Sequence, residues 1–149
     1  MPTAYSSSFN FREPADSPGD VSRGARRLLR AFATSSQHIE ACAVISTDGF
    51  IVASVLSDSV DEDRFGAMCA SLLSLSARAA SEAQRGELRQ VILDGTLGPM
   101  LLTRAGELGA LAVATNPQAN LGRVMIDTRR TAQDLAALVT PSAEGQETM

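Results

Sequence analysis

The amino-acid sequence predicts an α+β domain whose elements follow the order αββαβββα. Three observations predict it: an Asp-Gly pair between two apolar runs, three later apolar runs joined by short glycine-containing connections, and three segments with apolar residues at helical spacing. A length of 149 residues allows one domain with a substantial core and leaves little room for two. We expect that domain over residues 20–139, between a flexible N-terminal arm at 1–19 and a flexible C-terminal tail at 140–149, because both ends are polar and lack periodicity.

The first helix and a hairpin are predicted at the start of the domain. The helix rests on apolar residues at helical spacing, with arginines mostly on the other side. These apolar residues are Val21, Ala25, Leu28, Leu29 and Phe32. Two runs rich in Val and Ile follow at 39–46 and 50–56, joined at Asp48-Gly49. Asp-Gly between apolar runs is typical of a tight antiparallel hairpin.

A second helix is predicted after the hairpin. Ser59 and Glu62 fit a capping box, and the acidic residues around them favour a helix N-terminus. The helical pattern continues to about Ala83 and stops at Gly86. It contains a segment, Phe65 to Ala77, with no charged residue at all.

The last part of the domain reads as a meander followed by a helix. Three apolar runs at 87–95, 99–106 and 108–115 are separated only by short glycine-containing connections, which predicts three antiparallel strands. Asn120 can cap a third helix, which Pro141 stops. The face expected to be apolar consists of Leu121, Val124, Met125, Thr128, Ala132, Leu135 and Val139.

Composition excludes several classes of function. The thirteen basic residues are all Arg, and seventeen acids outnumber them to give a net charge of −4, so we expect no nucleic-acid partner. Without any Lys the chain cannot form the P-loop of a GTPase. The N-terminus shows no secretory signal and the uncharged helical segment is too short to span a bilayer, so we expect a cytoplasmic protein without membrane insertion. Cys42 and Cys69 lie in apolar segments and are interpreted as packed thiols.

The uncharged segment of the second helix predicts a surface for self-association. One side forms an apolar stripe expected to pack on the sheet: Phe65, Met68, Cys69, Leu72, Leu75, Ala79 and Ala83. The remaining sides carry small or uncharged residues where a solvated helix normally carries Glu, Lys or Arg. We therefore predict a symmetric homodimer, rather than a cover from the same chain. If the strand after this helix is a sheet edge, it can pair with its own copy. The predicted interface consists of Gly66, Ala67, Ala70, Ser71, Leu73, Ser74, Ala77, Ser81, Val91 and Leu93.

These segments together resemble the Roadblock, or dynein-light-chain and LAMTOR type, domain family, in particular its stand-alone, MglB-like bacterial members. The resemblance is carried by AVISTDGFIVAS, by VDEDRFGAMCASLLSLSARAA, by GALAVATN and by the final amphipathic helix from Leu121. It covers about residues 21–139. It implies a profilin-like α/β/α domain with a central five-stranded antiparallel sheet, the second helix on one face and the first and third helices on the other.

In function, the resemblance implies a homodimer built through the second helix and third strand that binds a small Ras-like, MglA-like GTPase. Such a protein is an adaptor or a regulator of the nucleotide cycle or of localisation, and not itself an enzyme. The family offers no shared catalytic residues, and the single histidine, His38, marks no catalytic triad. No cofactor or metal is expected, because capping and turns explain the aspartates near the second helix. Small-molecule sensing, or scaffolding without a GTPase, stays open as the alternative.

Overall fold

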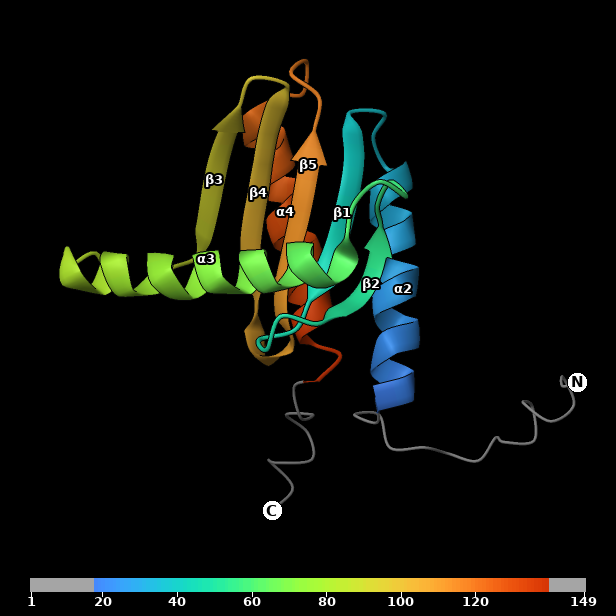
Figure 1. Ribbon diagram of the computed structural model, residues 1–149. Helices are drawn as coiled ribbons and strands as arrows, with labels where there is room; N and C mark the ends of the chain where they lie inside the picture. Colours follow the sequence, from blue (N-terminus) through green and yellow to red (C-terminus); the bar gives the residue numbers. More distant parts are fainter. Residues whose placement is uncertain (1–17, 140–149) are drawn as a thin grey trace, which may run out of the picture.

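A five-stranded antiparallel sheet is the middle layer of the computed structural model, which describes residues 18–139 (Figure 1). Along the sheet the strands follow the order β2-β1-β5-β4-β3, so β2 and β3 are its edges. The strands are β1 (Ile39–Ile45), β2 (Ile51–Val55), β3 (Gln90–Gly95), β4 (Gly98–Ala105) and β5 (Gly109–Thr115). All neighbouring strands are antiparallel, as predicted.

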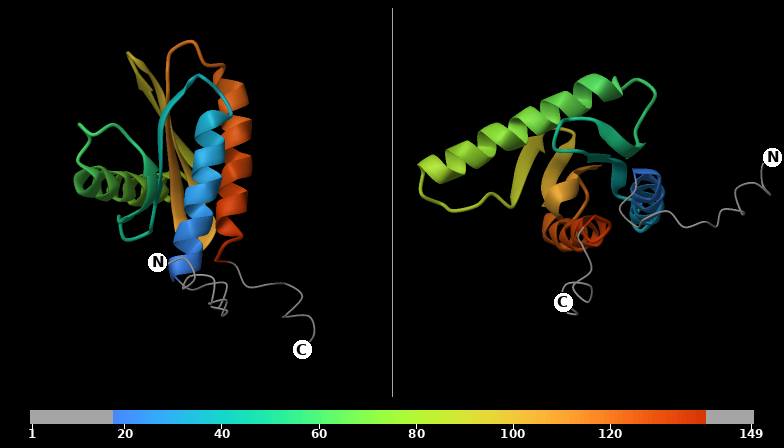
Figure 2. Two further views of the ribbon diagram at one scale, coloured as in Figure 1. Left: turned by 90° about the vertical axis from the view of Figure 1, so that its right-hand side faces the viewer. Right: turned by 90° about the horizontal axis from the view of Figure 1, so that it is seen from below.

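Three α-helices cover the two faces of the sheet. They are α2 (Pro18–Thr34), α3 (Glu62–Glu82) and α4 (Leu121–Ala136), and a short 3₁₀ turn, η1 (Gly106–Leu108), joins β4 to β5. Figure 2 shows α2 and α4 side by side on one face and α3 alone on the other. The predicted order and the three-layer architecture are therefore confirmed. Within residues 18–139, no helix is both long and apolar enough to cross a bilayer.

The sheet separates two apolar clusters. The larger lies beneath α2 and α4, where Leu29, Leu101 and Leu135 are almost completely buried. The smaller lies beneath α3, where three of the buried residues that the strands contribute are alanines, Ala43, Ala110 and Ala112. The predicted apolar face of α4 is confirmed at its centre, since its buried residues are Val124, Thr128, Ala132 and Leu135. A shallow layer of alanines under α3 allows that helix to lie close to the strands.

The Asp48-Gly49 hairpin is confirmed. The Ser46 amide donates to the Phe50 carbonyl at 2.8 Å, and the Gly49 amide donates to the Ser46 carbonyl at 2.9 Å. Gly49 has a φ of +93°, which only glycine adopts without strain. The two strands are slightly shorter than the predicted runs at 39–46 and 50–56.

One predicted domain boundary differs from the structure. Helix α2 begins at Pro18, so the last two residues of the predicted arm at 1–19 already belong to the domain. A proline fits the first turn of a helix, because no intrahelical partner is needed for an N–H there. The rest of that arm and the predicted tail at 140–149 lie outside the described residues.

The capping box predicted at Ser59 and Glu62 is wrong. Asp61 caps α3 instead, and its side chain accepts a hydrogen bond from the Arg64 amide at 3.1 Å. The Glu62 carboxylate accepts a hydrogen bond from the Ser54 hydroxyl of β2 at 2.7 Å, rather than turning back to its own helix. A contact between segments has replaced the local one that sequence reasoning assumed.

Candidate functional site

The first turn of α3 is held in place by the β1–β2 hairpin. Gly66 lies against Gly49, and a Cβ added at Gly66 would stand 2.4 Å from the Gly49 carbonyl oxygen. Any side chain at Gly66 therefore clashes with backbone, not with a movable group. This close approach determines which side of α3 faces the sheet.

Few residues of α3 are buried, and all of them lie in its first two thirds. They are Gly66, Cys69 and Leu73. On the opposite side Met68 and Leu75 are 56% and 63% exposed. The exposed residues between Phe65 and Ala77, which we call the outer face of α3, are Ala67, Met68, Ser71, Ser74 and Leu75. The outer face is uncharged, and nothing within residues 18–139 covers it.

The predicted orientation of α3 is wrong in part. Met68, Leu75, Ala79 and Ala83 are predicted to face the sheet, but all four are exposed, whereas Leu73 is predicted to face outward and is buried. The prediction assumes that the largest apolar side chains face the core. The glycine contact with the hairpin instead rotates the helix, so that two large apolar side chains point outward. A glycine inside an otherwise good helix was the sequence signal of this close approach.

The ten predicted interface residues accordingly fall into three groups. Two are buried on the side of α3 that faces the sheet, Gly66 and Leu73. Three are half-buried, Ala70, Ala77 and Val91, and five are exposed: Ala67, Ser71, Ser74, Ser81 and Leu93. The first two are covered within one subunit and do not belong to its free surface. The predicted set does not include Met68 and Leu75, the largest side chains of the outer face.

The exposed edge of β3 adjoins α3. The last turns of α3 extend past β3, beyond the sheet of their own subunit (Figures 1 and 2). No α3 residue after Leu73 is buried, in agreement with that overhang. Strand β3 pairs with β4 along one side only, and its Ile92 and Leu93 are 41% and 38% exposed. At the β3–β4 turn Leu97 is 84% exposed. An uncharged helix and an apolar edge strand therefore lie together at one end of the molecule.

A cleft of about 320 Å³ lies between α3 and the ends of β1 and β4. Ser46, Ser74 and Ala110 contribute to its small polar and apolar lining, and the cleft also borders the side chains of Arg78 and Arg104. Within the described part of the chain neither arginine forms an ion pair. The cleft thus combines a mostly apolar lining with two cations available to an anionic group.

The polar and nucleophilic side chains offer little chemistry. Burial raises the pKa of Cys42 to about 12 and that of Cys69 to about 11, so both thiols remain protonated at neutral pH. His38 Nδ1 lies 3.2 Å from Asn116 Oδ1, just before the start of β1 and just after the end of β5. Among residues 18–139, no three His, Cys, Asp or Glu side chains lie together as metal ligands would.

Comparison with known proteins identifies relatives of the whole fold. A model of the Roadblock/LC7 domain matches residues 27–115. The uncharacterized protein MJ1340 of Methanocaldococcus jannaschii is 35% identical over 103 residues, which are 69% of this chain and 90% of that protein. The gliding protein MglB from Thermus thermophilus has a similar structure, with a TM-score of 0.69 at 17% identity, over 80% of this chain and 90% of that chain. An MglB with a tetrameric arrangement gives a TM-score of 0.71 at 19% identity over the same shares.

Proposed function

Because this chain belongs to the Roadblock/LC7 family, we propose that it is a non-catalytic, homodimeric binding protein that regulates or positions a small Ras-like GTPase of the MglA type. The observation that carries the proposal is the uncharged outer face of α3. A helix face that is permanently solvated normally carries charges, and depletion of charge at the centre is the composition of a protein interface.

The proposed dimer has its twofold axis beside β3. Each β3 then pairs with its own copy and continues the sheet from one subunit into the other. The overhanging end of each α3 would extend toward the partner, and the two helices would lie side by side with their outer faces in contact. Met68 and Leu75 supply apolar area, and Ala67, Ser71 and Ser74 allow two helices to approach closely. Arg78 and Glu82 follow as exposed charges, as expected of a rim.

The area of the available surface and the assembly of a protein with a similar fold support this dimer. A stable interface buries about 800 Å² per partner, more than a few exposed side chains provide. The 21-residue α3 extends over roughly 31 Å, so helix and edge strand together offer a surface of that order. A protein of similar fold, MglB, is known in a tetrameric arrangement.

The proposed partner follows from the family and from what this chain lacks. The chain has no P-loop of its own, so it would act on the nucleotide state of another protein. A partner that binds the GTP and GDP forms of a GTPase with different affinity shifts the balance between them by that difference alone. We propose that the joined α3 surfaces of both subunits contact the switch loops of the GTPase, which makes dimerisation a condition for binding.

Size-exclusion chromatography with light scattering tests both steps. The protein is run alone and with an MglA-type GTPase from the same organism, loaded with GDP or with a non-hydrolysable GTP analogue. We expect a dimer that co-elutes with one nucleotide form. Leu75→Glu should be monomeric and should not co-elute, whereas Ile126→Glu, at a side chain 56% exposed on α4, should behave as the wild type. A monomeric wild type refutes the dimer, and a dimer that ignores both nucleotide forms refutes the GTPase partner.

The cleft beside α3 favours a second candidate function, the sensing of a small anionic molecule. Its volume of about 320 Å³ falls at the lower end of the range of ligand pockets. Arg78 and Arg104 would bind the negative group of the ligand. Thermal-shift screening against nucleotides and carboxylate metabolites tests it: stabilisation that Arg104→Gln abolishes would support a ligand, and the absence of any shift would refute it.

A further inference from the structure

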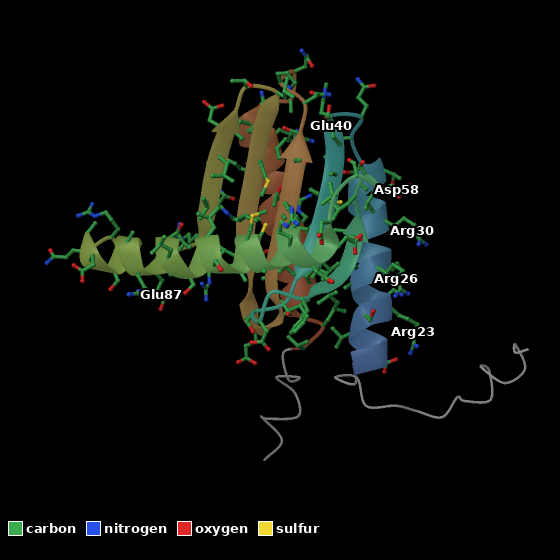
Figure 3. All side chains as sticks on the ribbon, in the orientation of Figure 1. Arg23, Arg26, Arg30, Glu40, Asp58 and Glu87 are labelled. Carbon is green, nitrogen blue, oxygen red and sulfur yellow. The ribbon has the colours of Figure 1, made fainter. Side chains whose placement is uncertain are left out.

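Helix α2 carries a row of arginines on the face turned away from the sheet. The row consists of Arg23, Arg26, Arg27 and Arg30, all exposed. Figure 3 shows Arg23, Arg26 and Arg30 pointing outward along one side of α2. Asp20 is the only acidic residue of the helix, and it pairs with Arg23. The other three arginines form no ion pair with any residue between 18 and 139.

The charge of α2 is opposite to that of the rest of the chain. Four arginines and one aspartate give α2 a net charge of +3. Because the whole chain carries −4, the residues outside α2 carry a net charge of −7. Arginines three and four residues apart repel one another and destabilise the helix. Helix α4, which packs on the same face of the sheet, carries both arginines and aspartates instead, and there Arg123 pairs with Asp127 at 3.4 Å. A helix in this position can therefore be solvated without a face made of arginines alone.

We propose that the arginine row of α2 binds an extended acidic segment of a partner protein. Arg23, Arg26 and Arg30 follow one another at steps of roughly 4.5 and 6 Å along the helix axis, and Arg27 lies beside Arg26. Alternate residues of an extended chain are about 6.6 Å apart, so carboxylates at every second position lie within reach of the long arginine side chains of the row. Guanidinium groups bind carboxylates in two-point contacts, which favours a chain of carboxylates over a diffuse anion.

An anionic membrane fits this surface less well than an acidic segment. None of the exposed large apolar side chains lies on α2, so the helix has nothing to insert between lipids. The surplus of seven negative charges elsewhere in the chain would be repelled by a negative bilayer, whereas a narrow acidic segment contacts α2 alone.

The proposed site is independent of the one on α3. The sheet separates α2 from α3, so both surfaces are open at the same time (Figure 2). Residues exchanged on α2 do not touch the outer face of α3, and the dimer and GTPase experiments remain unaffected by them. The protein would then join a partner on one face to a second partner on the other.

Fluorescence anisotropy with the full-length protein tests the inference. The probe is a fluorescein-labelled peptide of four Glu-Ser repeats, and a peptide of four Gln-Ser repeats controls for charge. The variant Arg26→Glu with Arg30→Glu is compared with Arg129→Glu with Arg130→Glu, which changes the net charge equally at exposed positions of α4. Circular dichroism confirms that each variant is folded. Sedimentation with phosphatidylcholine vesicles containing phosphatidylserine tests the membrane separately.

The expected result is saturable binding of the acidic peptide in about 0.1 M salt, where the Debye length is about 10 Å, and no binding of the neutral peptide. The α2 variant should bind the acidic peptide roughly tenfold more weakly, as the loss of several exposed ion pairs implies. The α4 variant should change by less than about twofold, because distant charges are screened. The inference is overturned by the absence of saturable binding, by equal loss in both variants, or by vesicle binding without peptide binding.

Discussion

Replacing Leu75 by Glu should dissociate the proposed dimer and leave each subunit folded. Leu75 is 63% exposed within one chain, so the substitution removes little from the subunit's own core. Complete burial of a leucine stabilises by about 1.5–3 kcal/mol, so covering the exposed part contributes about 1–2 kcal/mol. Because a twofold dimer contains this contact twice, the loss is about 2–4 kcal/mol per dimer, which raises Kd roughly 30- to 1000-fold. The desolvation of the new carboxylate adds to this loss.

Sedimentation equilibrium over a range of protein concentrations measures that change in Kd directly. Ile126→Glu is the matched control, because its side chain is 56% exposed but lies on α4, across the sheet from the outer face. Leu73→Ala is the opposite case: at 9% exposure it should lower the free energy of unfolding of each subunit by about 2–5 kcal/mol. If Leu75→Glu dimerises with the wild-type Kd, or if Ile126→Glu dissociates equally, the account of the outer face is refuted.

Three further changes test the packing of the domain in urea unfolding. Gly66→Ala should lower the free energy of unfolding by about 1–3 kcal/mol despite alanine's better helix propensity, because its Cβ would stand 2.4 Å from the Gly49 carbonyl oxygen; unchanged stability would contradict that contact. Thr128→Val should raise it by about 1 kcal/mol, since the buried Thr128 Oγ1 has no hydrogen-bond partner within residues 18–139; a loss would reveal a partner for the hydroxyl. Burial raises the pKa of Cys69 to about 11 and of Cys42 to about 12 from 9.0, so the unfolded thiols ionise first. Stability should therefore fall as the pH rises above 9, and that fall should shrink in a variant with both cysteines replaced by Ala.

The order of the elements could be predicted from the sequence because each leaves a local signal. Asp48-Gly49 between apolar runs is a property of the hairpin itself, and the buried residues of α4 recur at the helical period. Local signals failed where a residue had a choice of partners. Glu62 fits a capping box in sequence, yet it accepts a hydrogen bond from Ser54 in the preceding strand. Such contacts depend on which strand lies beside the helix, and periodicity carries no information on that.

The candidate site likewise has one feature that the sequence reveals and others that only the fold determines. That α3 has a segment with no charge on any side could be read from composition, which does not depend on the fold. Which side of the helix is free could not, since it is the contact between Gly66 and Gly49 that turns Met68 and Leu75 away from the sheet. The position of the end of α3 beyond β3 is likewise a property of the folded chain, because the angle at which a helix crosses a sheet depends on side chains from several strands at once.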